Sequence, residues 1–209
     1  MNKELIIKEL DKLYPDAVCE LYYNKDYELL LAVMLSAQTT DKKVNSVVKD
    51  LFNKYDSLDK LDTIEIEKLE NILKPIGLYK NKAKNFKIIV KRIKEDYGFV
   101  PNDRSYLESL PGVGRKTTNV VLSNLYGEAL FAVDTHVNRV SKVFGIASPL
   151  DDVLKVEEKL YKFFPKDKVG KLHHQFVLFG RYICKSQKPE CDRCPFKGKC
   201  NKTKEKAND

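Results

Sequence analysis

Hydrophobic residues recur along this chain with the spacing of α-helices. Between residues 41 and 54 five apolar residues follow one another at i, i+3, i+4, i+7 and i+8, which places them on one helical face; they are Val44, Val47, Val48, Leu51 and Phe52. Thr40 or Asp41 offers a side-chain oxygen that can cap the start of this helix. Residues 27–37 predict an apolar helix that lies buried in a core. The period-two alternation of a half-buried strand is almost absent.

The same periodicity predicts further helices, and glycine or proline marks several of their ends. Their apolar faces fall within residues 3–13, 61–73, 83–97, 115–126, 135–144, 151–164 and 172–183. Gly98, Gly127, Gly145 and Pro165 follow four of these stretches, as helix stops commonly do. The polar tail, residues 201–209, is expected to fray. We therefore predict an all-α fold.

A glycine turn interrupts this helical pattern in the sequence LPGVGRKTT, residues 110–118. Helix-compatible segments on both sides, residues 105–110 and 115–126, predict two short helices joined by a tight turn. The first N–H groups of the second helix then point outward, which makes a small phosphate cradle with Lys116 at its mouth. The spacing matches neither a P-loop nor a dinucleotide-binding fingerprint. Taken alone, the stretch also fits an ordinary corner between two helices of an all-α protein.

Charge adds a polyanion to the possible partners. The 209 residues include 38 basic and 30 acidic side chains, which gives a formal net charge of +8. Such an excess favours a nucleic-acid partner, although a lysine-rich surface alone has the same composition. The longest apolar run, residues 29–35, is too short to cross a bilayer, and the first ten residues have no signal-peptide core. We expect a cytosolic protein, in which disulfides are rare.

Four of the five cysteines form a cluster near the end of the sequence. Cys184, Cys191, Cys194 and Cys200 have the spacing C-x6-C-x2-C-x5-C, which in a cytosolic protein predicts a metal centre rather than disulfides. Zinc and a [4Fe–4S] cluster both accept four thiolates, and the spacing favours iron–sulfur only modestly. Cys19 stands apart and is expected to be a small core or surface residue.

The loop between the first two of these cysteines, residues 185–190, carries Lys185 and Lys188. A metal centre would fix the loop and present both cations outward, where they could contact phosphates. The alternative is a solvated, lysine-rich tail.

Together these motifs resemble the endonuclease III family, which are DNA glycosylase/AP lyases of the helix-hairpin-helix superfamily. The resemblance rests on LPGVGRKT, on VDTH at residues 133–136, on MLSAQTTD at 34–41, on IGLYKNKA at 76–83 and on the four-cysteine spacing. It extends along essentially the whole chain. It implies that the metal centre is a [4Fe–4S] cluster, which the spacing alone leaves open.

The resemblance also implies a domain organisation. A six-helix barrel is expected at residues 21–131, with the helix-hairpin-helix at about 105–126. Residues 1–20 and 132–209 are expected to form a second helical domain, which holds the cluster. In this family the two domains flank a DNA cleft.

The implied activity is the removal of oxidised pyrimidines, followed by cleavage of the strand 3′ to the lesion. Lys116 matches the family's nucleophile, an amine that attacks C1′ of the sugar and forms a Schiff base that permits β-elimination. Asp134 matches the carboxylate that stabilises positive charge on the sugar and assists proton transfer. The implied partner is double-stranded DNA with damaged pyrimidines or abasic sites. A monomer suffices, and no membrane is involved.

The resemblance further assigns DNA contacts. Gln38 fills the space opposite the extruded base, and Leu78 inserts into the opposite strand. The remaining candidates are Gly112, Val113, Gly114, Arg115, His136, Lys185 and Lys188. Each also has a purely structural interpretation: Gln38 as a loop glutamine, Leu78 as a core leucine, and His136 as part of a first helical turn. Lys116 alone could be a surface lysine, and Asp134 alone a helix N-cap.

Two other functions share parts of this pattern. Adenine-specific mismatch glycosylases of the same superfamily have the hairpin, the aspartate and the cluster, but usually lack the lysine and carry an added C-terminal domain. A non-catalytic DNA-binding or redox protein could use the hairpin and cluster without Lys116 and Asp134. Cleavage of DNA that contains thymine glycol separates these alternatives from endonuclease III activity.

Overall fold

The computed structural model describes residues 1–204 and confirms the all-α prediction. Twelve α-helices and three short 3-10 helices make up the regular structure of the described residues, which include no strand. Two compact units emerge: residues 20–126 form one, and residues 1–19 with 127–209 form the other. The chain thus leaves the second unit after its first helix and returns to it later. Whether these units are the barrel and cluster domains that the resemblance implies stays a prediction.

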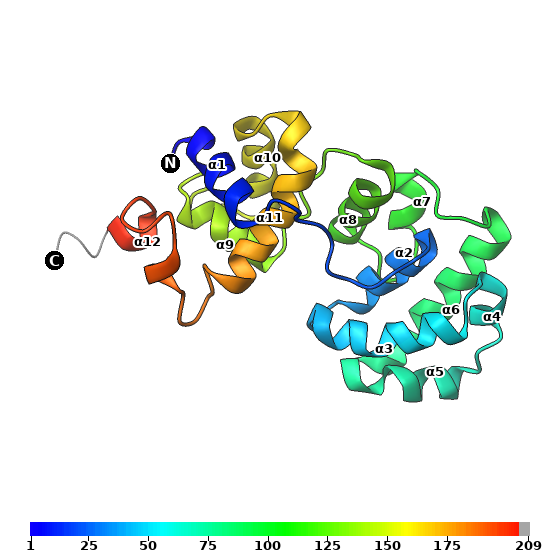
Figure 1. Ribbon diagram of the computed structural model, residues 1–209. Helices are drawn as coiled ribbons and strands as arrows, with labels where there is room; N and C mark the ends of the chain where they lie inside the picture. The colour runs from blue at the N-terminus through cyan, green and yellow to red at the C-terminus, as the bar shows by residue number, and fades with distance from the viewer. Residues whose placement is uncertain (205–209) are drawn as a thin grey trace. The chain divides into compact units, whose positions relative to one another are not determined.

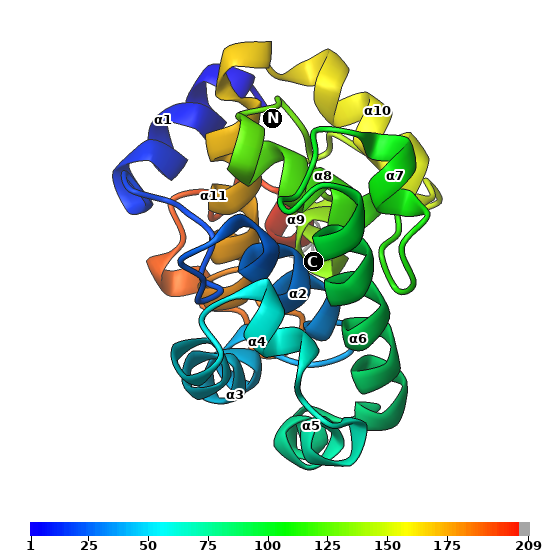
Figure 2. The same ribbon diagram turned by 90° about the vertical axis from the view of Figure 1, so that its right-hand side faces the viewer.

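The unit of residues 20–126 is built around a buried helix. Its helices are α2 (Asp26–Leu35), α3 (Asp41–Lys54), α4 (Leu58–Asp62), α5 (Ile66–Leu73), η1 (Lys74–Ile76), α6 (Tyr79–Asp96), α7 (Arg104–Glu108) and α8 (Arg115–Tyr126). Every residue of α2 after Asp26 is buried, and α2 packs against α3, α6 and α8 (Figure 2). A helix surrounded in this way needs apolar residues on all its faces, which explains the apolar run from Leu29 to Leu35.

The ends of these helices follow from local chemistry. Of the two predicted capping residues, Thr40 rather than Asp41 caps α3, because its side-chain oxygen accepts a hydrogen bond from the N–H of Lys43. The predicted apolar helix of residues 27–37 ends earlier, at Leu35, and Ser36 donates its hydroxyl to the carbonyl of Val33. Inside the unit, the buried carboxylate of Glu28 accepts backbone N–H bonds from Asn24 and Lys25, which holds the chain where it enters α2.

The other unit packs its helices around a core rich in phenylalanine. Its helices are α1 (Lys3–Leu13), α9 (Thr135–Val143), α10 (Val153–Phe163), η2 (Lys166–Lys168), α11 (Val169–Tyr182), η3 (Cys191–Arg193) and α12 (Asn201–Lys204). Helix α11 lies against α1 and α9 (Figure 1). The core rings meet edge to face or at a tilt; they belong to Phe131, Phe144, Phe164, Phe176, Phe179 and Phe196. Phe196 comes from the cysteine-rich segment and ties that segment to the core.

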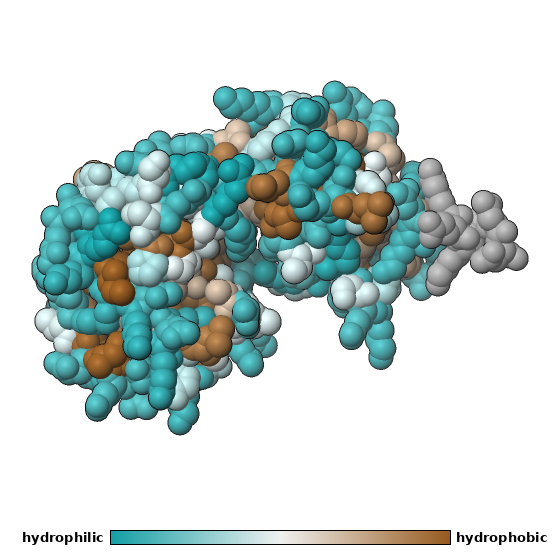
Figure 3. Space-filling view, turned by 180° about the vertical axis from the view of Figure 1, so that it is seen from behind, coloured by the Kyte–Doolittle hydropathy of each residue, from teal (hydrophilic) through white to brown (hydrophobic). Residues whose placement is uncertain are grey.

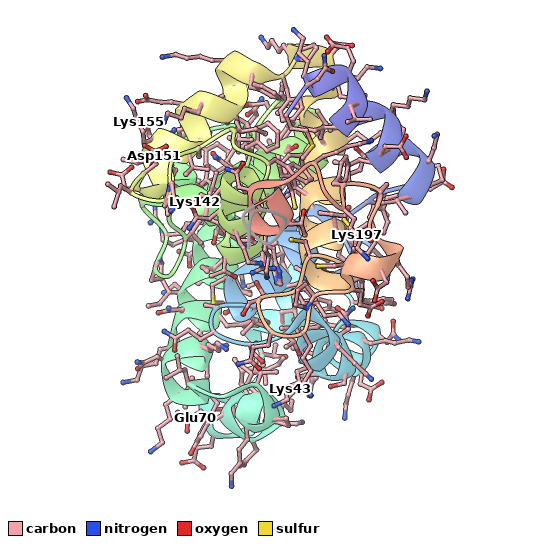
Figure 4. All side chains as sticks on the ribbon, turned by 90° about the vertical axis from the view of Figure 1, so that its left-hand side faces the viewer. Lys43, Glu70, Lys142, Asp151, Lys155 and Lys197 are labelled. Carbon is pink, nitrogen blue, oxygen red and sulfur yellow. The ribbon has the colours of Figure 1, made fainter. Side chains whose placement is uncertain are left out.

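The connection between α9 and α10 is held by charged side chains. Lys142 donates to the carbonyl of Pro149 over 3.1 Å, and Asp151 pairs with Lys159 over 2.6 Å. Figure 4 labels Lys142 and Asp151 on this part of the unit. These contacts fix the loop that separates the two helices.

The C-terminal tail differs from expectation. Residues 201–204 form α12 rather than a frayed end, because Thr203 accepts a bond from the N–H of Gly198 and Asn201 donates to the carbonyl of Lys142. The rest of the predicted tail, residues 205–209, lies outside the described residues.

Hydrophilic residues cover much of the face seen in Figure 3, and apolar residues form only small patches on it. In residues 1–204 no helix is both long and apolar enough to span a bilayer.

Candidate active site and metal centre

The predicted hairpin consists of α7, α8 and the turn between them. Gly112 at this turn has φ +76°, a left-handed conformation that favours glycine. A Cβ built on Gly112 would lie 2.7 Å from Nδ2 of Asn85 and 3.3 Å from Cγ of Met34. The turn therefore sits directly on side chains of α6 and α2, and a side chain at this left-handed position would be strained.

The next two residues of the turn differ in burial: Val113 is buried and Gly114 is exposed. The side chain of Val113 is 3% exposed, and its N–H donates to the carbonyl of Leu110 over 3.1 Å. Val113 thus anchors the turn in the core. Gly114 does not have a left-handed φ, and a Cβ added to it would meet nothing within 4 Å. Gly114 consequently leaves open surface beside the start of α8, where another molecule's backbone could approach.

Lys116 lies in the first turn of α8 and is exposed, as is Arg115. Further along α8, Thr118 and Asn119 are buried, and Arg104 of α7 donates to Oδ1 of Asn119 over 2.9 Å. This bond fixes α7 against α8, so Lys116 extends from a rigid base. The N-terminus of α8 also favours negative charge, as the phosphate cradle requires.

Strained backbone marks three of the predicted DNA contacts. In the described residues the only non-glycine residues with positive φ are Gln38 at 56°, Leu78 at 50° and Lys188 at 47°. Such conformations are uncommon outside glycine and cluster at functional sites. Leu78 is 54% exposed, so packing in a core does not account for it. Gln38 is exposed too, in the loop between α2 and α3.

Asp134 is the N-cap of α9. Its Oδ1 accepts bonds from the N–H groups of His136 at 2.9 Å and Val137 at 2.8 Å. Both cap bonds use the same oxygen, and they hold the half-buried carboxylate in one orientation. The structural interpretation of Asp134 as a cap is therefore correct, and it leaves Oδ2 as the oxygen that could face a substrate.

The guanidinium of Arg139, on the helix that Asp134 caps, connects several of these residues. Arg139 donates to the carbonyls of Cys184 and Gly180, at 3.0 and 2.7 Å, and lies 3.2 Å from Nδ1 of His136. Arg139 carries a permanent charge and has no acceptor, so Nδ1 accepts and the imidazole proton sits on Nε2. Burial, with Arg139 adding to it, lowers the pKa of His136 although Asp134 opposes the shift. The neutral form of His136 is thus favoured more than in a free histidine.

Close packing of α9 on α11 makes this arrangement possible. A Cβ on Gly180 would lie 2.8 Å from Cβ of His136 and 3.2 Å from Cγ2 of Val140. Glycine at residue 180 therefore lets the two helices approach, and the carbonyl of Gly180 comes within reach of Arg139.

All four clustered cysteines line one pocket, together with Phe144 and Phe179. Burial raises the pKa of the Cys184 and Cys194 thiols, and the neighbouring thiols push these pKa values in the same direction. The four sulfur groups are thus close enough to influence one another. In residues 1–204 no three His, Cys, Asp or Glu side chains are grouped so as to hold a single metal ion. The thiols surround a space rather than meet at one point.

The two candidate cations of the cysteine loop differ. Lys185 forms an ion pair with Glu190 of the same loop, and Arg193 contacts the same carboxylate over 2.8 Å. This differs from the expectation that both lysines point outward as available cations, and the reason is that Glu190 lies near enough to pair. Lys188 is exposed and has the left-handed backbone noted above.

The predicted residues fall into both compact units. Gln38, Leu78 and residues 112–116 belong to the unit of residues 20–126; Asp134, His136, the four cysteines and the two loop lysines belong to the other. Sequence reasoning missed Arg139 and Asn85. Arg139 was detectable in part, because its i+3 spacing from His136 places both on one helical face. Nothing in the sequence indicates that Asn85 lies against the hairpin turn.

Comparison with known proteins gives consistent matches. A model of the HhH-GPD superfamily of base excision DNA repair proteins matches residues 31–166. Endonuclease III of Bacillus subtilis (strain 168) is 48% identical over 198 residues, which cover 94% of this chain and 90% of that protein.

Two solved structures are 45% identical to this chain. The first is a non-covalent endonuclease III–DNA complex, with a TM-score of 0.92. The match covers 99% of this chain and 97% of the endonuclease III chain. A trapped endonuclease III–DNA covalent intermediate has a TM-score of 0.91 and covers 99% of both chains.

Proposed function

The chain belongs to the HhH-GPD superfamily of base excision DNA repair proteins and, within it, to the endonuclease III family, and from this we propose that it is a bifunctional DNA glycosylase and AP lyase that removes oxidised pyrimidines. The observation that carries the proposal is 45% identity, over 99% of this chain, to an endonuclease III trapped in a covalent intermediate with DNA. A covalent intermediate requires a nucleophile, and the exposed Lys116 occupies the position of the family's nucleophile.

Lys116 supplies the electron pair in this mechanism. Its neutral amine forms a bond to C1′ of the sugar while the bond from C1′ to the base breaks and the base leaves with the electron pair. The C1′–O4′ bond then breaks as the nitrogen loses a proton and O4′ gains one, which gives the Schiff base. The Schiff base allows a proton to leave C2′, and the C3′–O bond then breaks, so that the 3′ phosphate leaves with the electron pair. Hydrolysis of the imine releases the lysine. The helix N-terminus around Lys116 disfavours a positive charge there and so assists formation of the neutral amine.

Asp134 provides the negative charge of the reaction. With Oδ1 held by two backbone N–H groups, Oδ2 is the oxygen that stabilises the positive charge that develops on the sugar. It can also accept a proton from the attacking amine. Lys116 and Asp134 belong to different units. The proposal therefore requires that both units bind the same nucleotide.

Access to C1′ requires that the damaged base leave the helical stack. We assign Gln38 to the space opposite the extruded base and Leu78 to insertion into the opposite strand. Both extend from strained turns, which fixes their direction before DNA binds. Gly112, Val113, Gly114 and Arg115 form the hairpin that grips a phosphate, where Val113 contributes backbone only. His136 and Lys188 extend the contact surface in the other unit, and Lys185 contributes through its loop.

The pocket of the four cysteines fits a [4Fe–4S] cluster. Cys184, Cys191, Cys194 and Cys200 would hold it, because such a cluster takes one thiolate at each iron and so needs thiols arranged around a space. Bound, the cluster supplies a rigid, charge-bearing knot that orders the loop of residues 185–190. Protein purified without oxygen should contain about four irons per chain, and serine at all four cysteines should abolish this iron content.

The partner in this proposal is double-stranded DNA with damaged pyrimidines or abasic sites, bound by a monomer. A base excision repair enzyme acts where the DNA is. We therefore place the protein in the cytoplasm, at the nucleoid.

Borohydride trapping tests the proposal. Incubation of the protein with a duplex that contains thymine glycol should give a covalent protein–DNA complex with borohydride and a nicked strand without it. Lys116→Gln should abolish both products. Lys91→Gln, which changes an exposed lysine on α6, is the matched control and should leave both unchanged.

Failure to trap or nick thymine glycol DNA would favour the two alternatives considered from the sequence. An adenine-specific mismatch glycosylase releases its base without this cleavage, and a non-catalytic protein releases none. Equal trapping by Lys116→Gln would exclude Lys116 as the nucleophile while keeping the enzyme assignment.

A further inference from the structure

Lys82 is a buried lysine to which the proposed mechanism gives no role. It lies in the first turns of α6 and is 4% exposed. Its ammonium donates a hydrogen bond to the carbonyl of Ile76 over 3.0 Å. Burial lowers the pKa of Lys82, as expected where a charge is taken out of water. A buried lysine is costly, so its contact with Ile76 calls for a reason beyond solubility.

The carbonyl that accepts the bond from Lys82 belongs to Ile76, the first residue of the turn that carries Leu78. Ile76 is buried at the end of η1, and Gly77 and Leu78 follow with φ of +67° and +50°. The first helical bond of α6 then runs from the N–H of Lys82 to the carbonyl of Leu78. Leucine rarely adopts such a backbone, so the surrounding structure must impose it. Lys82 thus contacts this turn twice: its side-chain ammonium bonds to the carbonyl of Ile76, and its backbone N–H bonds to the carbonyl of Leu78.

The base from which Lys82 reaches the turn is rigid. Its neighbours Ala83 and Phe86 on the same helix are fully buried. Asn85, one turn further on, lies against Gly112 of the hairpin. The first two turns of α6 thus contact both the Leu78 turn and the hairpin turn, and they fix the spacing between these two within one unit.

We propose that Lys82 is a positioning residue that, through the carbonyl of Ile76, holds the 76–78 turn so that Leu78 is presented for insertion into DNA; this rests on the proposed function. The buried ammonium acts through the turn and does not touch the substrate. Without it the Ile76 carbonyl loses its partner, the two left-handed residues relax, and Leu78 no longer points in a fixed direction.

A double-mutant cycle tests this with the cluster-containing protein. The DNA duplexes carry a noncleavable analogue of an abasic site, with the fluorescent base 2-aminopurine next to it. The fluorescence of 2-aminopurine reports its unstacking from the neighbouring bases. Lys82→Met and Leu78→Ala should each reduce the unstacking equilibrium about tenfold. The double variant should be no worse than Leu78→Ala alone, because Lys82 acts through Leu78. Lys82→Arg, which keeps a cationic donor, should recover part of the loss, and Lys91→Met on the same helix should change nothing.

Additive losses in the double variant would overturn the proposal, because a purely structural lysine weakens the unit whether or not Leu78 is present. If Lys82→Met does not fold, Lys82→Arg alone decides. Its altered reach should speed hydrogen exchange in residues 74–79 and reduce unstacking only when Leu78 is present; an equal reduction with Leu78→Ala contradicts the proposal. Nicking of thymine glycol DNA by the unmodified protein is measured in parallel, so failure of the enzyme assignment is distinguished from failure of the role of Lys82.

Discussion

Asp134 combines two roles that a single substitution can separate. Asparagine caps helices as well as aspartate does, so Asp134→Asn should keep the bonds to His136 and Val137 while it removes the charge. We expect the free energy of unfolding to be preserved and the trapping rate to fall by about 10²–10⁴-fold. Asp134→Ala should lose the same activity and also about 0.5–2 kcal/mol of stability. Denaturant unfolding and single-turnover trapping measure the two effects.

The comparison of these two variants is informative in either direction. Wild-type trapping by Asp134→Asn would mean that the residue is only a cap. A large loss of stability in Asp134→Asn would mean that the negative charge, rather than the geometry, holds α9 in place.

The histidines of the second unit give the stability of the protein a pH dependence. Burial lowers the pKa of His174 from its ordinary value of 6.5. The unfolded chain therefore takes up a proton as pH falls below 6.5, while the folded state resists it until a lower pH. The free energy of unfolding should therefore decrease as pH falls between these two pKa values. Above pH 6.5 the contribution of His174 to stability is complete. His136 is shifted in the same direction.

His174→Gln removes one of these contributions. Between about pH 7.5 and about pH 5.5 its free energy of unfolding should decrease less than that of the wild type, as measured by urea unfolding at each pH. If the free energy of unfolding depends on pH in the same way in both proteins, the pKa of His174 is the same in the folded and unfolded states.

Among the elements, the hairpin makes the most specific prediction because its two glycines differ. Gly112→Ala places a methyl group against Asn85 on a left-handed backbone and should cost about 1–2 kcal/mol of stability. Gly114→Ala has neither problem, so its stability should lie within about 0.5 kcal/mol of wild type. Its methyl group instead occupies the open surface beside α8, and affinity for DNA should fall.

Thermal unfolding and fluorescence-anisotropy titration with abasic-site DNA measure these effects. Loss of stability in Gly114→Ala with unchanged DNA affinity would reverse the assignment of the two glycines.

At the scale of elements the sequence predicts most of the fold. Helical periodicity and capping residues located most of the helices, because these signals are local, although the predicted helix of residues 61–73 is divided between α4 and α5. The α12 helix was missed, since Asn201 donates to the distant carbonyl of Lys142 and Thr203 accepts from the N–H of Gly198 in the preceding turn. The same limit applies to the site: motifs identified Leu78 and Gly112, but only the folded chain shows that Lys82 and Asn85 support their turns. Likewise the pairing of Lys185 with Glu190 needed the loop's conformation.

Over the whole molecule, the count of 38 basic side chains overstates the cations that are available to DNA. Many lysines are already paired with acidic neighbours, for example Lys159 with Asp151 and Lys197 with Asp192. A paired lysine contributes little to counterion release, because its carboxylate partner already neutralises it. The salt dependence of DNA binding should therefore reflect a small set of exposed cations rather than the total.

The two lysines of the cysteine loop test this directly. The logarithm of the DNA association constant falls linearly with the logarithm of salt concentration, with a slope of about −0.9 per phosphate contact. Lys188→Ala should make this slope shallower by about one, because Lys188 is exposed. Lys185→Ala removes a charge paired with Glu190 and should change the slope by less than half as much. Anisotropy titrations over a range of potassium concentrations measure both slopes. Equal changes would mean that the Lys185–Glu190 pair opens when DNA binds, and no change for Lys188→Ala would remove this loop from the DNA interface.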